Sequence, residues 1–389
     1  MGKMLTQMRN TLIATAKRIR PFLHSEQAGG RLLMLATALS VLLANSPWSS
    51  SYIGCWDQVV FHHSLSQWIN DAVMAFFFLL VGLELKREVL FGLLSKWQFA
   101  VMPMAAAIGG MLVPVLIFAV FNYNTTTLSG AGIPMATDIA FALAILALGG
   151  KAVPYALKVF LTALAVIDDL GAIAVIAVGY TKNIQSVYLG LAGGLILCLY
   201  LLHRKRVSKS WPYMILGLLL WIALFQSGVH ATLAGVILAL FIPLNNNEEP
   251  ALASQWQHFL HVPVALLVLP LFALANTALP LGDIKWATLT APLAMGIFWG
   301  LFLGKPLGIL GGVWVVQKAK WGQLPAELSM KHILLVGIMG GIGFTMSLFI
   351  SMLALDQASL IQDAKMVVLL AAVFSSVAGI VAMKLFLKR

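Results

Sequence analysis

The chain has 389 residues, of which 60% are hydrophobic and only 10% are charged. Soluble domains carry about a quarter of charged residues, so this composition excludes an ordinary soluble domain and favours the lipid bilayer as solvent. The net charge of +11 does not indicate a nucleic-acid partner, because the basic residues lie in short segments between apolar runs and form no patch on a polar domain. Cys55 and Cys198 are far apart and match no disulfide framework or metal spacing.

The first stretch of the chain is basic and is predicted to lie at the membrane surface. No short apolar core followed by small residues occurs early in it, which argues against a cleavable signal peptide. Residues 5–20 combine basic and apolar side chains in a way that is typical of an amphipathic surface helix. We therefore predict a cytoplasmic amphipathic segment at residues 1–28 and a single transmembrane domain at residues 29–389.

Apolar runs long enough, or nearly long enough, to cross a bilayer follow one another along the rest of the chain. A transmembrane helix needs about 20 mostly apolar residues, and lipid-exposed loops are not tolerated at that depth. The sequence predicts an all-α polytopic membrane protein with about twelve transmembrane helices, at residues 30–46, 66–88, 99–121, 131–149, 155–180, 185–202, 211–226, 228–243, 259–279, 290–316, 332–355 and 366–386.

Lysine and arginine residues are concentrated in alternate connections, which sets the orientation. The basic connections are the N-terminal arm, Lys86 to Lys96, Lys151 to Lys158, Arg204 to Lys209, Lys318 to Lys331, and Lys384 to Arg389. The opposite connections hold only Lys182, Lys285 and Lys365. An even number of helices with both termini in the cytoplasm satisfies this distribution.

Two predicted spans are interrupted by residues that weaken helices. Residues 129–138, SGAGIPMATD, place glycines, a proline and an aspartate at the start of the fourth span, and residues 337–347, GIMGGIGFTMS, place glycines in the middle of the eleventh. Each is the middle helix of a group of three, at 99–180 and 290–386. Matched interruptions favour a transporter built from inverted repeats, in which opened backbone lines a binding site. Close helix packing at small residues is the alternative.

Charged side chains occur inside the predicted spans. Each costs at least about 2.5–3.5 kcal/mol near the bilayer centre, so we take as site candidates Asp138, Asp168, Asp169 and Lys305. A single buried acid can instead be a satisfied structural hydrogen-bond partner. That alternative is weaker for the adjacent pair in VIDDLGA, whose side chains project about 100° apart on a helix.

Carboxylates in this setting suit a hard cation such as Na+, which prefers oxygen ligands. We expect Asp169 to be the first ligand, with Asp168 beside it and Thr137 as a hydroxyl contributor. Burial and a neighbouring carboxylate both favour the protonated form of a carboxyl group, so protons and cations compete for the pair, and competition is enough for exchange. If two groups unload per cation, the membrane potential drives the cycle; reconstituted vesicles that ignore an imposed potential would contradict this hypothesis.

Asp138 and Lys305 have further candidate roles. Broken helices present partial positive charge at their N-termini and partial negative charge at their C-termini, and two crossing breaks bring like ends together. Asp138 is suited to neutralising the positive ends. Lys305 is suited either to neutralising the negative ends or to pairing with Asp168, and the residue types are compatible with both.

Seven segments form a long ordered pattern: WINDAVMAFFFLLVGLELKRE (68–88), IPMATDIAFAL (133–143), ALAVIDDLGAI (163–173), SGVHATLAGV (227–236), LPLFALANT (269–277), GKPLGI (304–309) and GIGFTMSLFI (341–350). In these segments the chain resembles the NhaA family of bacterial sodium/proton antiporters, from about Ser64 to the C-terminal helix. The resemblance implies inverted repeats of helices 3–5 and 10–12, in which the interrupted fourth and eleventh helices cross. It places the ion site at Asp168 and Asp169, with Asp138, Thr137 and Lys305 nearby.

The resemblance also implies an activity, a location and a regulatory region. Such a protein is a secondary antiporter of the bacterial inner membrane that expels Na+ or Li+ in exchange for protons, without enzymatic activity or a cofactor. Its pH response is attributed to a cytoplasmic funnel, whose matching residues are Glu84, Arg87, Glu88, His258 and His261. Histidine titrates in the right range, with ordinary interface charges as the alternative. This chain has Gln257 where the family commonly has glutamate, so its pH profile need not follow the family's.

The connection between the first two spans, PWSSSYIGCWDQVVFHHSLSQ, is short. Family members can carry a β-hairpin there that pairs across a dimer, and we expect this chain to lack it. A homodimer is still expected, with Na+, H+ and the lipid bilayer as the other partners and no nucleic acid.

Three other functions are compatible with parts of the pattern. A sodium-coupled organic-anion symporter of similar fold needs an inverted repeat, but not an Asp-Asp pair beside an intramembrane lysine. An intramembrane aspartyl protease needs two aspartates facing each other from separate helices, whereas Asp168 and Asp169 diverge on one helix. A channel conducts faster than buried, protonatable binding groups allow.

Overall fold

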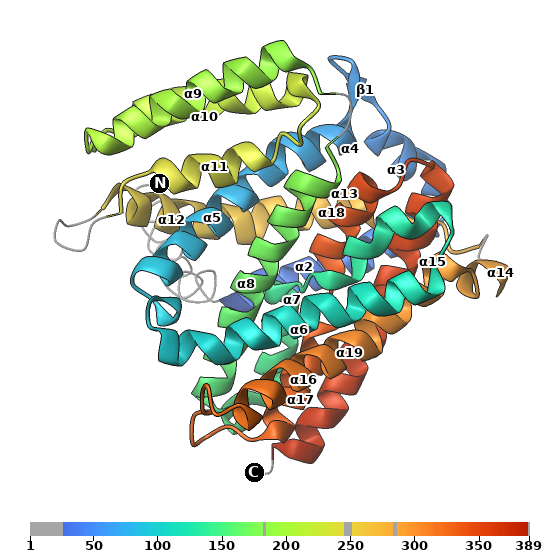
Figure 1. The fold of residues 1–389 in the computed structure, drawn as a ribbon. Helices are drawn as coiled ribbons and strands as arrows, with labels where there is room; N and C mark the ends of the chain where they lie inside the picture. Colours follow the sequence, from blue (N-terminus) through green and yellow to red (C-terminus); the bar gives the residue numbers. More distant parts are fainter. Residues whose placement is uncertain (1–25, 182–183, 245–250, 283–285, 388–389) are drawn as a thin grey trace, which may run out of the picture.

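The computed structural model describes residues 26–181, 184–244, 251–282 and 286–387, and these residues are almost entirely helical (Figure 1). The predicted surface segment at residues 1–28 lies largely outside them. In the described part of the chain, eight helical spans are long and apolar enough to cross a membrane, or ten if each of two bent pairs is one span. The eight are Leu65–Leu90, Trp97–Phe121, Tyr155–Gly179, Ser186–Arg204, Ser210–Ser227, Leu252–Asn276, Pro292–Lys318 and Ala358–Phe386. The predicted all-α polytopic fold class is confirmed.

Three of these spans contain a π-helical turn, which inserts an extra residue into the helix and is frequent at functional sites. In chain order the elements of these spans are α4 (Leu65–Trp68), η1 (Ile69–Val73) and α5 (Met74–Leu90); α12 (Leu252–Pro263), η5 (Val264–Val268) and α13 (Leu269–Asn276); and α15 (Pro292–Trp299), η6 (Gly300–Gly304) and α16 (Lys305–Lys318). The remaining five are α6 (Trp97–Phe121), α8 (Tyr155–Gly179), α9 (Ser186–Arg204), α10 (Ser210–Ser227) and α19 (Ala358–Phe386).

Two of the predicted spans, the first and the eighth, are not among the eight long helical spans. The first is α2 (Glu26–Ala44), and the eighth is α11 (Leu233–Phe241). At 1.5 Å per residue α11 rises only about 14 Å, roughly half of a hydrocarbon core of about 30 Å. Gly228 ends α10 in the left-handed conformation, with φ of 82°, and the backbone stays non-helical up to Thr232.

Both predicted interruptions are present. The fourth span consists of η3 (Thr126–Met135), α7 (Ile139–Leu146) and η4 (Ala147–Ala152), bent by 44°, and the eleventh of α17 (Met330–Gly340) and α18 (Phe344–Ala354), bent by 47°. The fourth span starts earlier than predicted, as a 3-10 helix. Its break at residues 136–138 therefore lies in the middle of the span and not at its start.

The expectation that the chain lacks a β-hairpin between its first two spans is wrong. After the short helix α3 (Ser49–Trp56), strands β1 (Val59–Val60) and β2 (His63–Ser64) pair antiparallel. The turn residues Phe61 and His62 both have positive φ, 48° and 68°, as a type I′ hairpin turn requires. The hairpin was missed because neither residue is the glycine or asparagine that normally marks such a turn.

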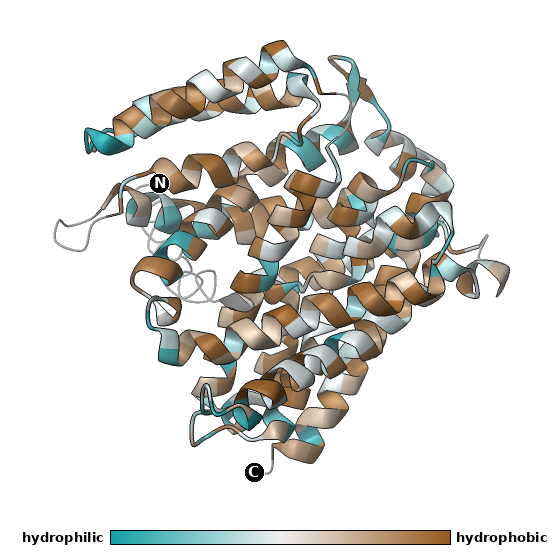
Figure 2. Cartoon of the chain, viewed as in Figure 1, coloured by the Kyte–Doolittle hydropathy of each residue, from teal (hydrophilic) through white to brown (hydrophobic). Residues whose placement is uncertain are grey.

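The outer surface is that of a protein surrounded by lipid. Figure 2 shows hydrophobic residues along the helices and hydrophilic residues gathered mainly at the connections, including the turn between α9 and α10. Helices α9 and α10 pack against each other at one edge of the molecule (Figure 1). The short elements η2 (Leu93–Ser95) and α14 (Trp286–Leu289) lie in connections.

Helices α6 and α16, the third and tenth spans, pack together through glycines. A Cβ atom on Gly308 would overlap the carbonyl group of Gly109, and one on Gly312 would overlap the carbonyl of Ala105. These glycines let the two backbones touch, as small residues do between membrane helices. The first helices of the two predicted repeats, α6 and α16, therefore pack in direct backbone contact.

Replacing Gly308 with valine is therefore expected to lower stability by about 1–3 kcal/mol, the usual effect of overpacking, because the opposing atoms belong to backbone and cannot move aside. Gly311→Val is the matched control, since a Cβ on Gly311 meets no atom within 4 Å. Thermal unfolding midpoints in detergent compare the two. Equal midpoints would contradict the close backbone packing.

Candidate ion-binding site

The two broken spans meet at their breaks, near the middle of the helical bundle. The backbone N–H of Asp138 donates to the carbonyl of Ile342, at 2.7 Å, and the hydroxyl of Thr137 donates to the carbonyl of Gly340, at 3.1 Å. A Cβ on Gly343 would lie only 3.1 Å from the carbonyl oxygen of Ala136. Glycine at this position thus permits the opened backbones to cross in contact.

Asp138 caps the second half of both broken helices. Its Oδ1 accepts from the N–H of Phe141 in the first turn of α7, at 2.9 Å. Its Oδ2 accepts from the N–H and the hydroxyl of Thr345 in the first turn of α18, at 3.1 and 2.7 Å. A carboxylate is the preferred group at such positive ends, and this contact is the one the helix-end hypothesis predicts. Thr345 lies in the GFTMS segment but was not singled out from sequence.

Lys305 pairs with Asp168 and not with a helix C-terminus. Its Nζ lies 2.5 Å from Asp168 Oδ2, and both side chains are fully buried. Thr137 donates to the same oxygen at 2.8 Å, so Asp168 joins the tenth span to the fourth. The π turn η6 ends immediately before Lys305, whose N–H donates to the carbonyl of Gly300, and Pro306 has no N–H to offer. These irregular backbone hydrogen bonds occur where the Lys305 side chain enters the bundle.

Asp169 is buried beside this pair, with an exposed fraction of only 4%. Asp169 Oδ1 and Asp168 Oδ1 are buried oxygens without a hydrogen-bond partner. Oxygen atoms of this kind are the ligands that a hard cation needs. Among the described residues no three His, Cys, Asp or Glu side chains cluster as a metal site, so a cation bound to these carboxylates takes its remaining ligands from hydroxyl, carbonyl or water oxygens.

A cavity of about 660 Å³ lies at the end of the bundle with the basic connections. Its walls come from the ends of α5, α6 and α8, and include Glu88, Lys96, Lys158 and Thr162. Ala163, the lining residue on α8 that is nearest to Asp169 in sequence, precedes Asp169 by about 9 Å along the helix. On this side less than two turns of α8 separate the cavity lining from Asp169.

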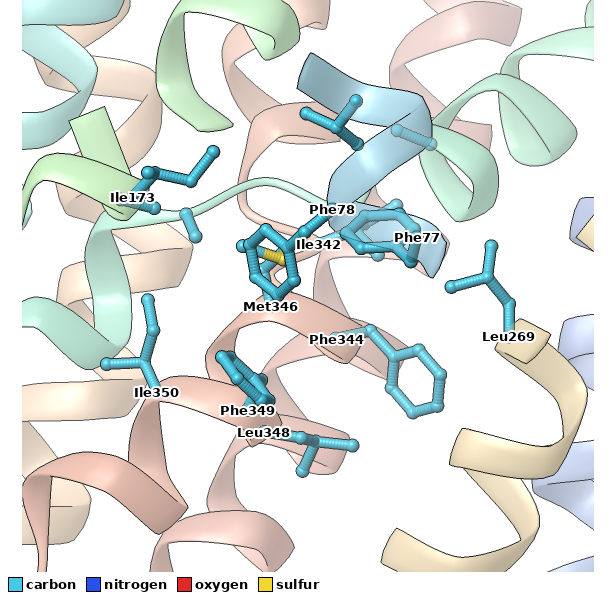
Figure 3. Close-up of a cluster of buried hydrophobic side chains, with 14 of the residues drawn as sticks. Phe77, Phe78, Ile173, Leu269, Ile342, Phe344, Met346, Leu348, Phe349 and Ile350 are labelled. Atoms are coloured by element: carbon cyan, nitrogen blue, oxygen red, sulfur yellow. The ribbon is translucent and has the colours of Figure 1, made fainter. Parts of the chain in front are cut away.

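An apolar layer of buried side chains lies further along α8, on the other side of Asp169 from the cavity (Figure 3). Ile173 lies on α8 one turn beyond Asp169, and Phe78, Met346 and Phe349 gather beside it. The rings of Phe78 and Phe349 are 5.3 Å apart, and Phe272 of α13 adds a third ring at 6.5 Å from Phe349. The arrangement therefore has a hollow on one side of the carboxylates and dense packing on the other.

The predicted funnel residues occupy two helices in contact, α5 and α12. Glu84 is half-buried on α5, and one turn further on the Arg87 guanidinium lies 3.8 Å from a carboxylate oxygen of Glu88. On α12, His258 is exposed, whereas His261 and Gln257 are half-buried. Of the five predicted residues only Glu88 lines the cavity. Sequence reasoning missed Lys158 and Thr162 because nothing local marks them.

Two broken helices that cross at buried carboxylates define the class of secondary transporters with discontinuous helices. Comparison with known proteins agrees. The Na+/H+ antiporter 1 family model matches residues 20–383, and the chain belongs to this family. It is 47% identical over 371 residues to Na(+)/H(+) antiporter NhaA 1 of Flavobacterium johnsoniae, covering 95% of this chain and 97% of the relative.

Further relatives give the same result. The chain is 46% identical to the Na(+)/H(+) antiporter NhaA of Cytophaga hutchinsonii, covering 94% of this chain and 95% of that protein. It is 48% identical to the NhaA antiporter of Vibrio cholerae, covering 88% and 90%. The family predicted from the motif segments is therefore confirmed over nearly the whole chain.

Proposed function

We propose that this protein exchanges Na+ or Li+ for protons across a membrane. The observation that carries the proposal is Asp169, a buried carboxylate with an unpartnered oxygen at the crossing of two broken helices. Family membership supports the same activity. The comparisons do not favour the organic-anion symporter, since the relatives are named as Na+/H+ antiporters.

The mechanism follows from the unequal partners of the two carboxylates. Asp168 already holds Lys305 and Thr137, whereas Asp169 Oδ1 has no partner and is the natural place for a proton or a cation. Both ligands compete for the same oxygens, so loading of one releases the other. The cavity admits them from one side. For the bound ion to leave on the opposite side of the membrane, the apolar layer at Phe78 and Phe349 must open and the cavity side must close.

Proton flux in everted membrane vesicles tests this function. Addition of Na+ or Li+ is expected to discharge a preformed pH gradient, over a series of pH values, in vesicles that contain the protein and not in vesicles that lack it. A sodium-coupled symporter would instead take up an organic anion with Na+ and leave the proton gradient unchanged. Absence of Na+- and Li+-driven proton movement at every pH would refute the exchange.

We further propose the bacterial inner membrane as the location, with both termini in the cytoplasm. The distribution of lysine and arginine supports this orientation. Lys86 stabilises one basic connection, because its ammonium donates to the carbonyls of Leu240 and Ile242 at the end of α11, at 2.7 and 2.6 Å. Cations are favoured at such helix C-termini.

A homodimer that pairs through the hairpin is also proposed. Val59 and Phe61 are 72% and 85% exposed, and the free edges of a two-stranded ribbon are templates for pairing with another strand. Replacing residues 59–64 by a Gly-Ser linker is expected to convert a dimer into a monomer in detergent while exchange persists. Light scattering coupled to gel filtration gives the mass, and an unchanged dimer would exclude the hairpin as the contact.

A further inference from the structure

Four polar or sulfur-containing side chains form a chain of hydrogen bonds at the end of the bundle opposite the basic connections. Lys365 Nζ of α19 donates to Asn276 Oδ1 of α13, at 2.9 Å. Asn276 Nδ2 donates to Asn70 Oδ1 of η1, at 2.8 Å. Asn70 Nδ2 in turn donates to the sulfur of Met352 in α18, at 3.3 Å. We name these four residues the polar clasp.

Asn276 is the centre of the clasp and is almost fully buried, with 1% of its surface exposed. Its Nδ2 also donates to the carbonyl of Phe272 in its own helix, at 3.0 Å, which fixes the orientation of the amide. Lys365 lies in the first turns of α19 and donates to this neutral amide. The clasp thus links α19, α13, η1 and α18 through three successive hydrogen bonds, with Asn276 accepting from Lys365 and donating to Asn70.

The clasp lies directly beyond the apolar layer, as seen from Asp169. Three helical spans contribute one residue to the apolar layer and one to the clasp. These pairs are Phe78 and Asn70 in the second span, Phe272 and Asn276 in α13, and Phe349 and Met352 in α18. In every case the two residues are one or two helical turns apart. The layer and the clasp therefore close the same route, one by apolar packing and the other by hydrogen bonds.

We propose that the polar clasp is a latch that holds the extracytoplasmic side of the ion route closed, with Asn276 and Lys365 as its positioning residues. The proposal rests on the exchange function, because an exchanger must expose its site to each side in turn. Opening the layer requires α13 and η1 to separate from α18 and α19. Two bonds of the clasp cross this separation, from Lys365 to Asn276 and from Asn70 to Met352, and both must break at that step.

Asn276→Leu and Lys365→Met each remove the bond between Lys365 and Asn276, which crosses the separation, with little change in volume. Each is expected to shift the population towards the outward-open state by about two- to twelve-fold, the factor that corresponds to the net strength of one hydrogen bond. A cysteine at Ser351 reports it, in a chain with Cys55→Ser and Cys198→Ser. Ser351 is fully buried next to Met352, and its hydroxyl bonds only the carbonyl of Leu348 in its own helix.

The measurement is the rate at which a membrane-impermeant maleimide labels this cysteine from the extracytoplasmic face. Both variants are expected to label faster, and Lys365→Arg, which keeps a cationic donor, is expected to label at the parental rate. Thr277→Val is the matched control: Thr277 adjoins Asn276, is fully buried, and its hydroxyl bonds only Ala273 of the same helix. It should also label like the parent.

Parental labelling rates in both Asn276→Leu and Lys365→Met would overturn the clasp, as would equal acceleration by Thr277→Val. Should Asn276→Leu fail to fold, Lys365→Met alone decides. Na+-driven proton flux, recorded in everted vesicles of the same strains, separates this proposal from the exchange function. Persistent flux with unchanged labelling refutes the latch only, whereas absent flux in the parent refutes the exchange.

Discussion

Asp169→Asn is expected to reduce Na+-driven proton flux to the level of vesicles without the protein. Asparagine has nearly the same size, so the packing around α8 is kept. Its amide does not bind or release a proton in the physiological range and contributes no negative charge to a cation. Proton binding and cation binding at this position are therefore both expected to be lost. The flux is measured with a pH-sensitive dye in everted vesicles, from neutral to alkaline pH.

Asp57→Asn is the matched control, because it makes the same chemical change at an exposed carboxylate between α3 and β1. That variant is expected to exchange at the parental rate. The unfolding midpoint of Asp169→Asn shows whether its loss of flux reflects chemistry or misfolding. Preserved exchange in a folded Asp169→Asn protein would defeat the site assignment, since no other buried carboxylate beside Asp168 on α8 is available.

The features that sequence reasoning predicted are those that the bilayer imposes locally. Apolar length indicates a span whatever the span packs against, so each of the twelve predicted segments overlaps a helix or a broken pair of helices, and α11 is clearly too short for a full crossing. Glycine and proline indicated both breaks because these residues weaken a helix locally, whatever surrounds it. Asp138, Asp168, Asp169 and Lys305 stood out because charge is costly in lipid, and all four are buried.

What the sequence did not reveal depends on contacts between distant segments. The partner of Lys305 lies 137 positions away, and the residue types fit either of two partners. Lys365, Asn276 and Asn70 come from three spans and show no common pattern until the fold brings them together. The π turns and the Phe61-His62 turn are backbone choices that ordinary residues make when tertiary packing favours them, and no local propensity marks them.

The other large effect is expected at the buried ion pair of Asp168 and Lys305. Asp168→Leu leaves a fully buried ammonium without its counter-charge, and breaking a buried pair in this way costs about 3–5 kcal/mol. Lys305→Met leaves Asp168 with the Thr137 hydroxyl as its remaining partner and is expected to be destabilised as well. The unfolding midpoint in detergent, followed by the fluorescence of the 11 tryptophans, measures each variant.

The double variant separates stability from transport. Replacing a buried ion pair by apolar residues of similar volume is often neutral or stabilising, so Asp168→Leu combined with Lys305→Met should regain most of the midpoint that either single variant loses. The coupling in this double-mutant cycle isolates the pair from its surroundings. A double variant less stable than both single variants would contradict the pairing. If the double variant is stable but moves no protons, an apolar core would serve the fold equally well, and the charges are present because the exchanged ions need them.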